Sequence, residues 1–357
     1  MDTVLNLGMN DEVCAGLAKK TGNPRFANDS YRRFLEMFGS VVLGIPRSHF
    51  EDEIDDLKYE KGVYEDSDLT ADDLQELAQK FKGVYTAQGM DFPQDVLVQL
   101  RLSIGAVFNG WMGARAVKYR QVEGIRNLLG TAVNVQAMVF GNMGDTSGTG
   151  VCFTRDPNNG NKELFGEFLI NAQGEDVVAG IRTPRPISEL EGNMPQVYAE
   201  FKRNTEILEE HYGDMQDIEF TIQEGKLFML QTRSGKRGGE AAVKIAVDLA
   251  EEGLVDKNEA IKKVLPEHLD QLLHPRFPDV ENKDYQSALV GKGLPASPGA
   301  AVGRIAMTNE KVVENKKNGI PSILVRDEVC VIISEYWSLL CMVVYWESMY
   351  LTCGLYL

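Results

Sequence analysis

Two pairs of polar residues near the middle of the sequence have the spacing of β-strands. Asp217 and Glu219 stand two residues apart, and so do Gln231 and Arg233, beyond a polar turn at 223–226 that contains glycine. Residues two apart share one face of a strand, so a hairpin could gather two carboxylates, an amide oxygen and a guanidinium. Oxygen ligands suit Mg²⁺, and arginine suits the phosphates that accompany it. The pattern indicates either a magnesium–phosphate site or the solvated face of an ordinary hairpin, the commoner case for such residues in isolation.

A glycine-rich loop at 141–150 is a second candidate. Glycine lets backbone amides approach an anion, and successive N–H groups can surround a phosphate, with the Thr149 hydroxyl beside Gly150 as a further donor. The loop is expected to join two strands and to act as a flap over phosphates. It lacks the strand-to-helix setting and the closing Gly-Lys-Ser/Thr of a P-loop. Loops of this composition also serve as plain turns.

Glu175 is a third candidate, at a glycine turn before a short apolar run. Its carboxylate could accept hydrogen bonds from ribose hydroxyls, although a surface turn explains the sequence equally well. The histidines show no mutual spacing that suggests a metal site, so structural or solvent roles are expected for His49, His211, His268 and His274.

Helical and strand patterns alternate around these candidates and predict an α+β fold. The capping residue Asp29 is expected to open one helix, and 67–70 another, with apolar residues at spacings of three and four. A long amphipathic segment runs from Pro93 to about Tyr119, and a further helix follows 238–239. Period-two alternation predicts strands at 133–140, 151–154, 164–171, 176–178 and in the hairpin 217–231.

Composition places the chain among ordinary globular proteins. Its 357 residues correspond to about two domains, with 43% hydrophobic and 25% charged residues, which excludes disordered, collagen-like and small disulfide-rich classes. The net charge of −16 argues against general nucleic-acid binding. The five cysteines show no paired or metal-type spacing and no signal peptide is apparent, so reduced thiols and a cytoplasmic location are expected.

The last residues, 329–357, differ from the rest because their only charges are Glu335 and Glu347. The apolar stretch between these glutamates has 11 residues, short of the ~20 that cross a bilayer. An accidental tail, from a shifted reading frame or an unspliced gene, fits better than a membrane anchor, so no membrane partner is expected.

Together, these segments resemble the nucleotide-binding part of the pyruvate phosphate dikinase family, over residues 1–328. The resemblance is carried by the segments 1–8, 29–34, 130–136, 140–150, 170–184, 217–223, 230–237 and 294–301. It implies a partial ATP-grasp fold in five parts: a mainly helical subdomain (1–93), an ATP-grasp nucleotide-binding lobe (94–238), a helical linker (239–284) with a polar, proline-marked stretch at 266–284, the truncated start of a swivelling phosphohistidine-type domain (285–328) and an atypical apolar tail (329–357).

The resemblance also implies roles for the hairpin residues. Glu219 and Gln231 would ligate Mg²⁺ with Asp217 beside them in the ATP site, and Arg233 would hold the ATP phosphates and serve catalysis. This favours the magnesium–phosphate interpretation of the hairpin over the ordinary solvated face.

The other candidates receive roles in the same way. Thr149 and Gly150 would lie on the phosphate-covering loop, and Glu175 would contact the nucleoside. The family enzyme is a phosphotransferase that converts ATP, phosphate and pyruvate to AMP, pyrophosphate and phosphoenolpyruvate, and a homodimer is among the expectations for the intact enzyme.

Three elements of the family plan have no counterpart in the sequence: a lobe before the 1–8 motif that supplies a lysine and an arginine, a Thr-Ser-His motif with the phosphorylated histidine, and the pyruvate-binding barrel. Phosphoryl transfer relies on positioning and charge stabilisation, so the chain alone is expected to be inactive and poorly soluble. Besides a damaged dikinase gene, two alternatives stay open: a non-catalytic nucleotide- or partner-binding module, and a fragment of a phosphoenolpyruvate synthase-like enzyme.

Overall fold

The computed structural model describes residues 4–122, 125–178, 182–273, 289–292, 302–326, 342–345 and 354–356. The chain divides into two compact units, Met1–Asp145 and Thr146–Leu357. This division lies inside the segment 94–238 that was predicted to form one nucleotide-binding lobe, so residues 94–145 belong to the same compact unit as the N-terminal helices.

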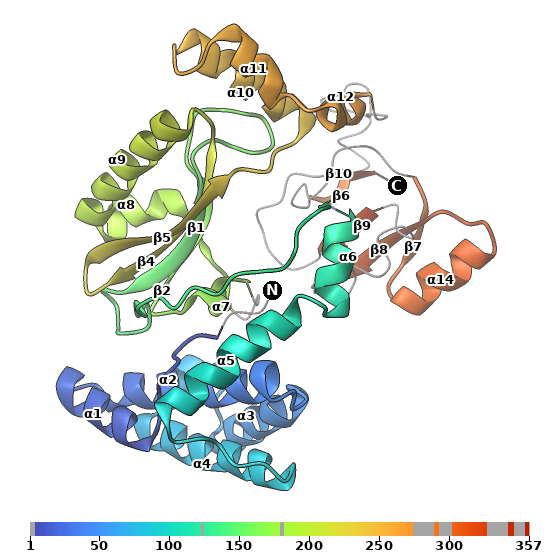
Figure 1. Cartoon of the computed structure of the whole chain (residues 1–357). Coiled ribbons are helices and arrows are strands. Elements are labelled where there is room, and N and C mark those ends of the chain that lie inside the picture. The colour runs from blue at the N-terminus through green and yellow to red at the C-terminus, as the bar shows by residue number, and fades with distance from the viewer. Residues whose placement is uncertain are drawn as a thin grey trace. The chain divides into compact units, whose positions relative to one another are not determined.

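The first unit is mainly helical (Figure 1). Aromatic side chains are prominent in its core. Phe50 lies edge-on to Phe81 with ring centroids 5.1 Å apart, and Tyr85 donates its hydroxyl to a buried backbone carbonyl. The four helices around this core are α1 (Asp11–Thr21), α2 (Pro24–Met37), α3 (Ser48–Lys61) and α4 (Ala71–Ala87); a π-helical turn, Phe38–Val42, continues α2, and a short 3₁₀ turn, Asp66–Asp68, precedes α4.

Helix starts in this unit follow capping chemistry, with one correction to the prediction. The helix expected after 67–70 is confirmed, because Thr70 and Asp73 form a capping box at the start of α4. Asp29, however, does not open α2. The Asn23 side chain caps that helix and Pro24 takes its first position, where proline is favoured, so Asp29 lies inside the helix and is buried.

The amphipathic segment 93–119 contains two helices. Asp95 caps α5 (Val96–Gly110), and α6 (Ala114–Val122) follows after a break at 111–113. The strand predicted at 133–140 is wrong, because these residues form neither strand nor helix. Their apolar alternation is real, but no strand in the described part of this unit offers the backbone partners that a ladder requires.

The second unit contains a five-stranded antiparallel sheet in the order β3-β2-β1-β4-β5. The strands expected at 164–171 and in the hairpin are confirmed, whereas 176–178 lies in a short helix, α7 (Gly174–Val178), in which the Asp176 carboxylate accepts the Gln173 N–H at 2.9 Å. The strands are β1 (Gly148–Phe153), β2 (Phe165–Ile170), β3 (Arg185–Pro186), β4 (Gln216–Gln223) and β5 (Lys226–Ser234).

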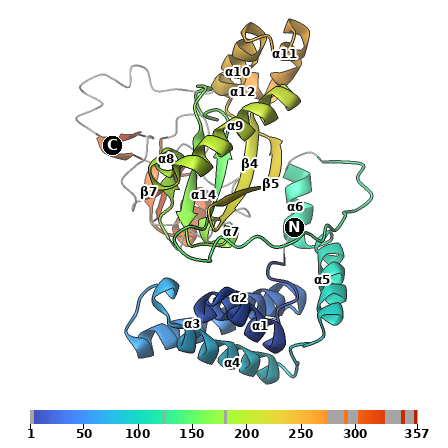
Figure 2. The ribbon, with the colours of Figure 1, turned by 90° about the vertical axis from the view of Figure 1, so that its left-hand side faces the viewer.

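One face of this sheet is covered by helices. After a 3₁₀ turn, Ile187–Glu189, the chain forms α8 (Leu190–Asn193) and α9 (Pro195–Tyr212), and α9 runs along the sheet (Figures 1 and 2). Phe201 of α9 packs on Phe220 of β4 with ring centroids 4.5 Å apart. Because strand side chains alternate, Ile218, Phe220 and Ile222 point to α9, and the odd-numbered residues of β4 face the other way.

Three further helices follow β5. The helix predicted after 238–239 is confirmed as α10 (Gly239–Glu251), which packs Ile245 and Leu249 against Met215. Next come α11 (Lys257–Lys263) and α12 (Pro266–Leu272), so the start of the polar stretch 266–284 is helical. Residues 274–284 of that stretch lie outside the described residues.

The C-terminal elements form two small sheets. A parallel sheet has the order β7-β8-β9, with the helix α14 between β7 and β8, and a separate antiparallel pair joins β6 to β10. Their bounds are β6 (Leu289–Lys292), β7 (Arg304–Ala306), α14 (Asn309–Lys317), β8 (Ser322–Arg326), β9 (Met342–Tyr345) and β10 (Gly354–Tyr356).

Only part of the predicted apolar tail lies within the described residues. Within 329–357 the structure describes β9 and β10, and the rest of the tail lies outside the described residues. Among the described helices, none combines the length and the apolar character needed to span a bilayer. The swivelling domain expected at 285–328 stays a prediction.

Candidate functional site

The four hairpin residues meet the geometric condition that the sequence sets. In the β4–β5 ladder, Asp217 is opposite Arg233 and Glu219 is opposite Gln231. All four belong to the sheet face turned away from α9, because Ile218, between the two carboxylates, is fully buried against that helix. The hairpin therefore brings the two carboxylates, the amide and the guanidinium to one face.

Two of these side chains are already paired with each other. Arg233 donates Nε–H to Asp217 Oδ2 at 2.7 Å. The Arg233 side chain is 63% exposed, whereas that of Asp217 is 11% exposed. Asp217 therefore anchors the guanidinium from the sheet surface and leaves most of the arginine in solvent.

The other two side chains have no partner in the protein. Across the part of the chain that the structure describes, the side chains of Glu219 and Gln231 form no hydrogen bond or ion pair. Glu219 is half-buried and Gln231 is exposed. Side chains directly opposite on antiparallel strands have Cβ atoms about 5 Å apart, so both oxygens can reach one ligand.

The sequence prediction missed a third carboxylate on the same face of the sheet. Val151 of β1 pairs with Glu219 on one side and with Glu167 of β2 on the other, so Glu167 shares the face of the candidate site. Glu167 is exposed, yet partial desolvation by its surroundings raises its pKa above the usual glutamate value. Alternation in 164–171 shows which residues share a side of the strand with Glu167. Only the order of the strands in the sheet shows which residues of other strands are its neighbours.

Thr149 and Gly150 are not on the loop, which corrects their predicted placement. Both lie in β1, a strand that is paired on both sides. The Thr149 hydroxyl is buried and lies 3.0 Å from the Phe220 carbonyl oxygen and 3.1 Å from the Thr221 hydroxyl. A Cβ at Gly150 would lie 2.6 Å from the Glu167 carbonyl oxygen, so glycine here allows close packing of the sheet.

The loop 141–147 that precedes β1 is held at both ends. In the first unit, Asn142 is buried and donates its side-chain amide to Asp29 at 2.9 Å. In the second unit, Ser147 accepts two backbone N–H groups, that of Glu224 at its hydroxyl and that of Asn171 at its carbonyl. These contacts anchor the two ends of the loop, and its expected role as a flap over phosphates stays a prediction.

Glu175 lies in the first turn of α7, which follows β2, and is half-buried. This helix contacts β1 and β2, and it follows the end of β2 that pairs with Gly148. Asp217 pairs with Phe153 at the opposite end of the same ladder. Five strand residues, or ~17 Å, separate the Gly148 and Phe153 rows, so Glu175 and the Asp217–Arg233 pair belong to opposite ends of the sheet.

The donor set limits how a metal could bind. Within the described residues, no group of three or more His, Cys, Asp or Glu side chains is arranged to hold a metal ion. Glu219 and Gln231 nevertheless offer two unpartnered oxygens of the hard type that Mg²⁺ accepts. The remaining coordination positions would therefore fall to water and to ligand oxygens, as is usual for Mg²⁺ bound with phosphates.

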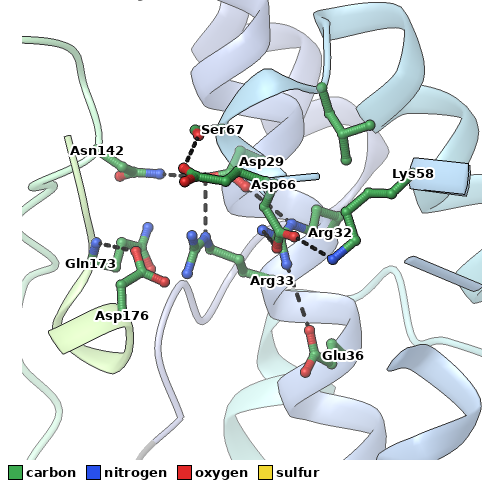
Figure 3. Close-up of polar contacts among 12 residues, drawn as sticks. Asp29, Arg32, Arg33, Glu36, Lys58, Asp66, Ser67, Asn142, Gln173 and Asp176 are labelled. Carbon is green, nitrogen blue, oxygen red and sulfur yellow. Dashed lines mark hydrogen bonds and ion pairs between the residues drawn. The ribbon is translucent and has the colours of Figure 1, made fainter. Parts of the chain in front are cut away.

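A second polar cluster lies in the first unit and has a different character (Figure 3). Asp29 accepts hydrogen bonds from Arg32 Nε and Arg33 Nε, both at 3.0 Å, and from Asn142. Arg32, 3% exposed, also donates to Asp66 at 2.9 Å. Burial by itself would raise the pKa of Asp29, but the charges of Arg33 and Arg32 outweigh it and hold that pKa well below its usual range.

Comparison with known proteins identifies the family. Residues 1–197 and 196–254 match the family described as "Pyruvate phosphate dikinase, AMP/ATP-binding domain". The chain is 59% identical over 329 residues to "Pyruvate, phosphate dikinase, chloroplastic" of Flaveria trinervia and to "Pyruvate, phosphate dikinase 1, chloroplastic" of Arabidopsis thaliana. It is 59% identical over 330 residues to the protein of the latter name from Zea mays. Each comparison covers 92% of this chain and 34% of the relative.

The chain therefore belongs to the pyruvate phosphate dikinase family, as the motifs predicted. It spans about a third of the length of the curated relatives it matches. The mixed helical and sheet structure is consistent with the family's AMP/ATP-binding domain. The relatives named above are described as chloroplastic. The cytoplasmic location expected from the sequence is therefore not confirmed and stays a prediction.

Proposed function

We propose that this chain is the ATP-binding portion of a pyruvate phosphate dikinase, with an ATP-grasp fold and Mg²⁺ as cofactor. The observation that carries the proposal is the pairing of Glu219 with Gln231, two unpartnered oxygen-bearing side chains next to an arginine held by Asp217. In the family reaction, ATP, phosphate and pyruvate give AMP, pyrophosphate and phosphoenolpyruvate. We also propose that 285–328 is the start of the family's swivelling domain and that the intact enzyme forms a homodimer.

Glu219 and Gln231 are the proposed metal ligands. One carboxylate and one neutral amide leave a bound Mg²⁺ with net positive charge, which attracts the polyphosphate that completes the coordination. Glu219 is half-buried, and the effective dielectric constant is lower there than in bulk water. The attraction between the bound ion and the polyphosphate is therefore stronger. Bound Mg²⁺ would supply neutralisation of phosphate charge.

Arg233 is the proposed phosphate-binding and catalytic residue. Asp217 accepts from Nε and so orients the guanidinium plane, while most of the Arg233 side chain is exposed. A guanidinium already in place when charge shifts on the transferring phosphoryl group needs no reorganisation, and this is the main protein contribution to such reactions. Asp217 therefore acts through Arg233.

The remaining residues set the direction of the nucleotide. Glu175, at the α7 end of the sheet, is the proposed nucleoside contact, so the phosphates extend toward the β4–β5 hairpin. Because the backbone of β1 pairs on both sides and the Thr149 hydroxyl is engaged, we assign Thr149 and Gly150 a supporting role under the phosphates. They fix the strand that separates Glu167 from Glu219.

Titration calorimetry of the full chain with ATP, with and without Mg²⁺, tests the proposal. The Glu219→Ala variant should lose at least tenfold in Mg²⁺-dependent affinity, with little change in stability, because the carboxylate has no partner in the fold. Glu206→Ala is the matched control, since it removes the same charge from an exposed position on α9, at the opposite face. Equal affinities of Glu219→Ala and the unsubstituted chain would contradict the proposal.

A further inference from the structure

The hairpin that carries the site contains one irregularity. From the turn, the two strands pair residue against residue as far as Phe220 opposite Met229. The next pair is Glu219 opposite Gln231, so Leu230 is an extra residue on β5. One additional residue on one strand of an antiparallel pair is a β-bulge, which bends the strand and increases its local twist.

With Leu230 present in the strand, the bulge is what keeps Gln231 and Arg233 on the face of Glu219. If the pairing of the turn continued without it, Leu230 would be opposite Glu219 and Gln231 opposite Ile218. Ile218 is fully buried against α9, so Gln231 and, two residues later, Arg233 would point into an apolar interface. The extra residue shifts the remainder of β5 by one and returns Gln231 and Arg233 to the Glu219 face.

The bulge lies at the edge of the sheet, where such irregularities are common. In the sheet order β5 is the outer strand, so the unpaired residue interrupts hydrogen bonding to one neighbour only. Met229, Leu230 and Gln231 border a groove at this edge of the sheet, together with Asn204, Ile207 and Leu208 of α9. Leu230 thus separates the part of β5 near the turn from the part that carries the polar site residues.

The geometry points to the Leu230 bulge as a positioning element of the magnesium–phosphate site: its presence, and not the leucine side chain, aims Gln231 and Arg233. This inference rests on the proposed function. Deletion of Leu230 leaves a regular hairpin with the Glu219–Gln231 and Asp217–Arg233 pairs formally intact, but it removes the bend and twist that place the tips of these side chains. Displacements of about 1 Å at a binding site are costly, so function should be affected more than folding.

The test compares three variants of the full chain by calorimetry with Mg-ATP and by urea unfolding. Deletion of Leu230 should lower Mg²⁺-dependent ATP affinity at least tenfold and leave the unfolding midpoint unchanged or higher. Leu230→Ala keeps the residue count and the bulge, so its affinity should equal that of the unsubstituted chain. Glu219→Ala reports on the site itself.

The outcomes separate the two claims. Normal affinity in the deletion variant, with weak binding in Glu219→Ala, would overturn the bulge inference and leave the proposed function standing. Weak binding in Leu230→Ala would also overturn it, because the side chain would then matter. Normal binding in Glu219→Ala would remove the proposed function and the inference with it.

A measurement on the unsubstituted chain covers the case in which the deletion variant fails to fold. Mg-ATP should slow amide hydrogen exchange in peptides covering 229–233, where the bulge leaves an unpaired backbone group, and not in peptides covering the turn at 223–228. Equal responses in the two segments would overturn the inference.

Discussion

The buried cluster around Asp29 and the open row of Glu219 and Gln231 use similar side chains in opposite ways. In the first unit, Asp29 is almost fully buried and is held by two arginines and an asparagine of the same chain. On the sheet of the second unit, Glu219 and Gln231 face each other with no partner among the described residues. Charges that the chain neutralises itself stabilise its fold, and acceptors left unmatched near the surface are available to a ligand.

The largest expected effect that separates the two regions is on stability. Asp29→Ala leaves the buried Arg32 and Arg33 without their shared acceptor, and breaking a buried ion pair from one side costs about 3 kcal/mol of the free energy of unfolding. Glu219→Ala should change that free energy by less than about 0.5 kcal/mol. Urea unfolding followed by far-ultraviolet circular dichroism measures both. Similar losses of unfolding free energy in the two variants would contradict the distinction between a structural cluster at Asp29 and a ligand site at Glu219.

Acid should act on the same cluster. The pKa of Asp29 is lower in the folded state than in the unfolded chain, so its contribution is complete above the usual aspartate pKa of ~3.9 and is lost as pH falls below it. Unfolding free energy should therefore fall from pH 5 to pH 3, by at most ~1.4 kcal/mol per pH unit for this group. Asp29→Ala should show a shallower slope in urea titrations at several pH values.

Some acid dependence should remain in that variant. The hydrogen bonds that Asp73 accepts from Lys61 and Thr70 lower its pKa to about 2, which acts in the same direction. An identical slope in the Asp29→Ala variant and the unsubstituted chain would show that the cluster does not set the acid response.

The smallest expected effect concerns Arg233. The arginine side of its ion pair with Asp217 is exposed, so the pair contributes at most ~1 kcal/mol to stability and Arg233→Lys should leave the unfolding midpoint unchanged. Lysine keeps the charge but loses the planar fork that matches phosphate, so affinity for Mg-ATP should fall about threefold to tenfold. Arg203→Lys, at an exposed position on α9, is the matched control. Unchanged affinity in Arg233→Lys would argue against the phosphate-binding role.

The sequence predicted the hairpin well because its determinants are local. Alternation, a polar turn with Gly225 and two residues at i and i+2 on each strand are enough to place Asp217 and Glu219 on one face. The bulge at Leu230 was not predictable, since alternation within one strand does not reveal the register against the other. Glu167 was missed for the same reason, because its neighbours depend on the order of the strands.

Interactions distant in sequence account for the other errors. Asp29 was interpreted as a helix cap because one of the donors that its carboxylate accepts from in the fold, Asn142, lies far along the chain. The pattern at 133–140 is that of a strand, yet a strand forms only where another backbone pairs with it. In α7 the local capping by Asp176 outweighs the β-branched valines that suggested a strand.

The buried guanidinium of Arg155 has a mechanical consequence for whatever follows the sheet. It lies directly after β1, is fully enclosed, and binds Glu209 of α9 at 2.6 Å and Glu252, at the end of α10, at 2.8 Å. Pulling α10 from the sheet would remove Glu252 from a buried cation and leave Glu209 as its main counter-ion, and Gly239 is in turn tied to Gln271 of α12. The enclosed guanidinium thus ties α9 and α10 to the end of β1, and the Gly239 contact extends this connection to α12.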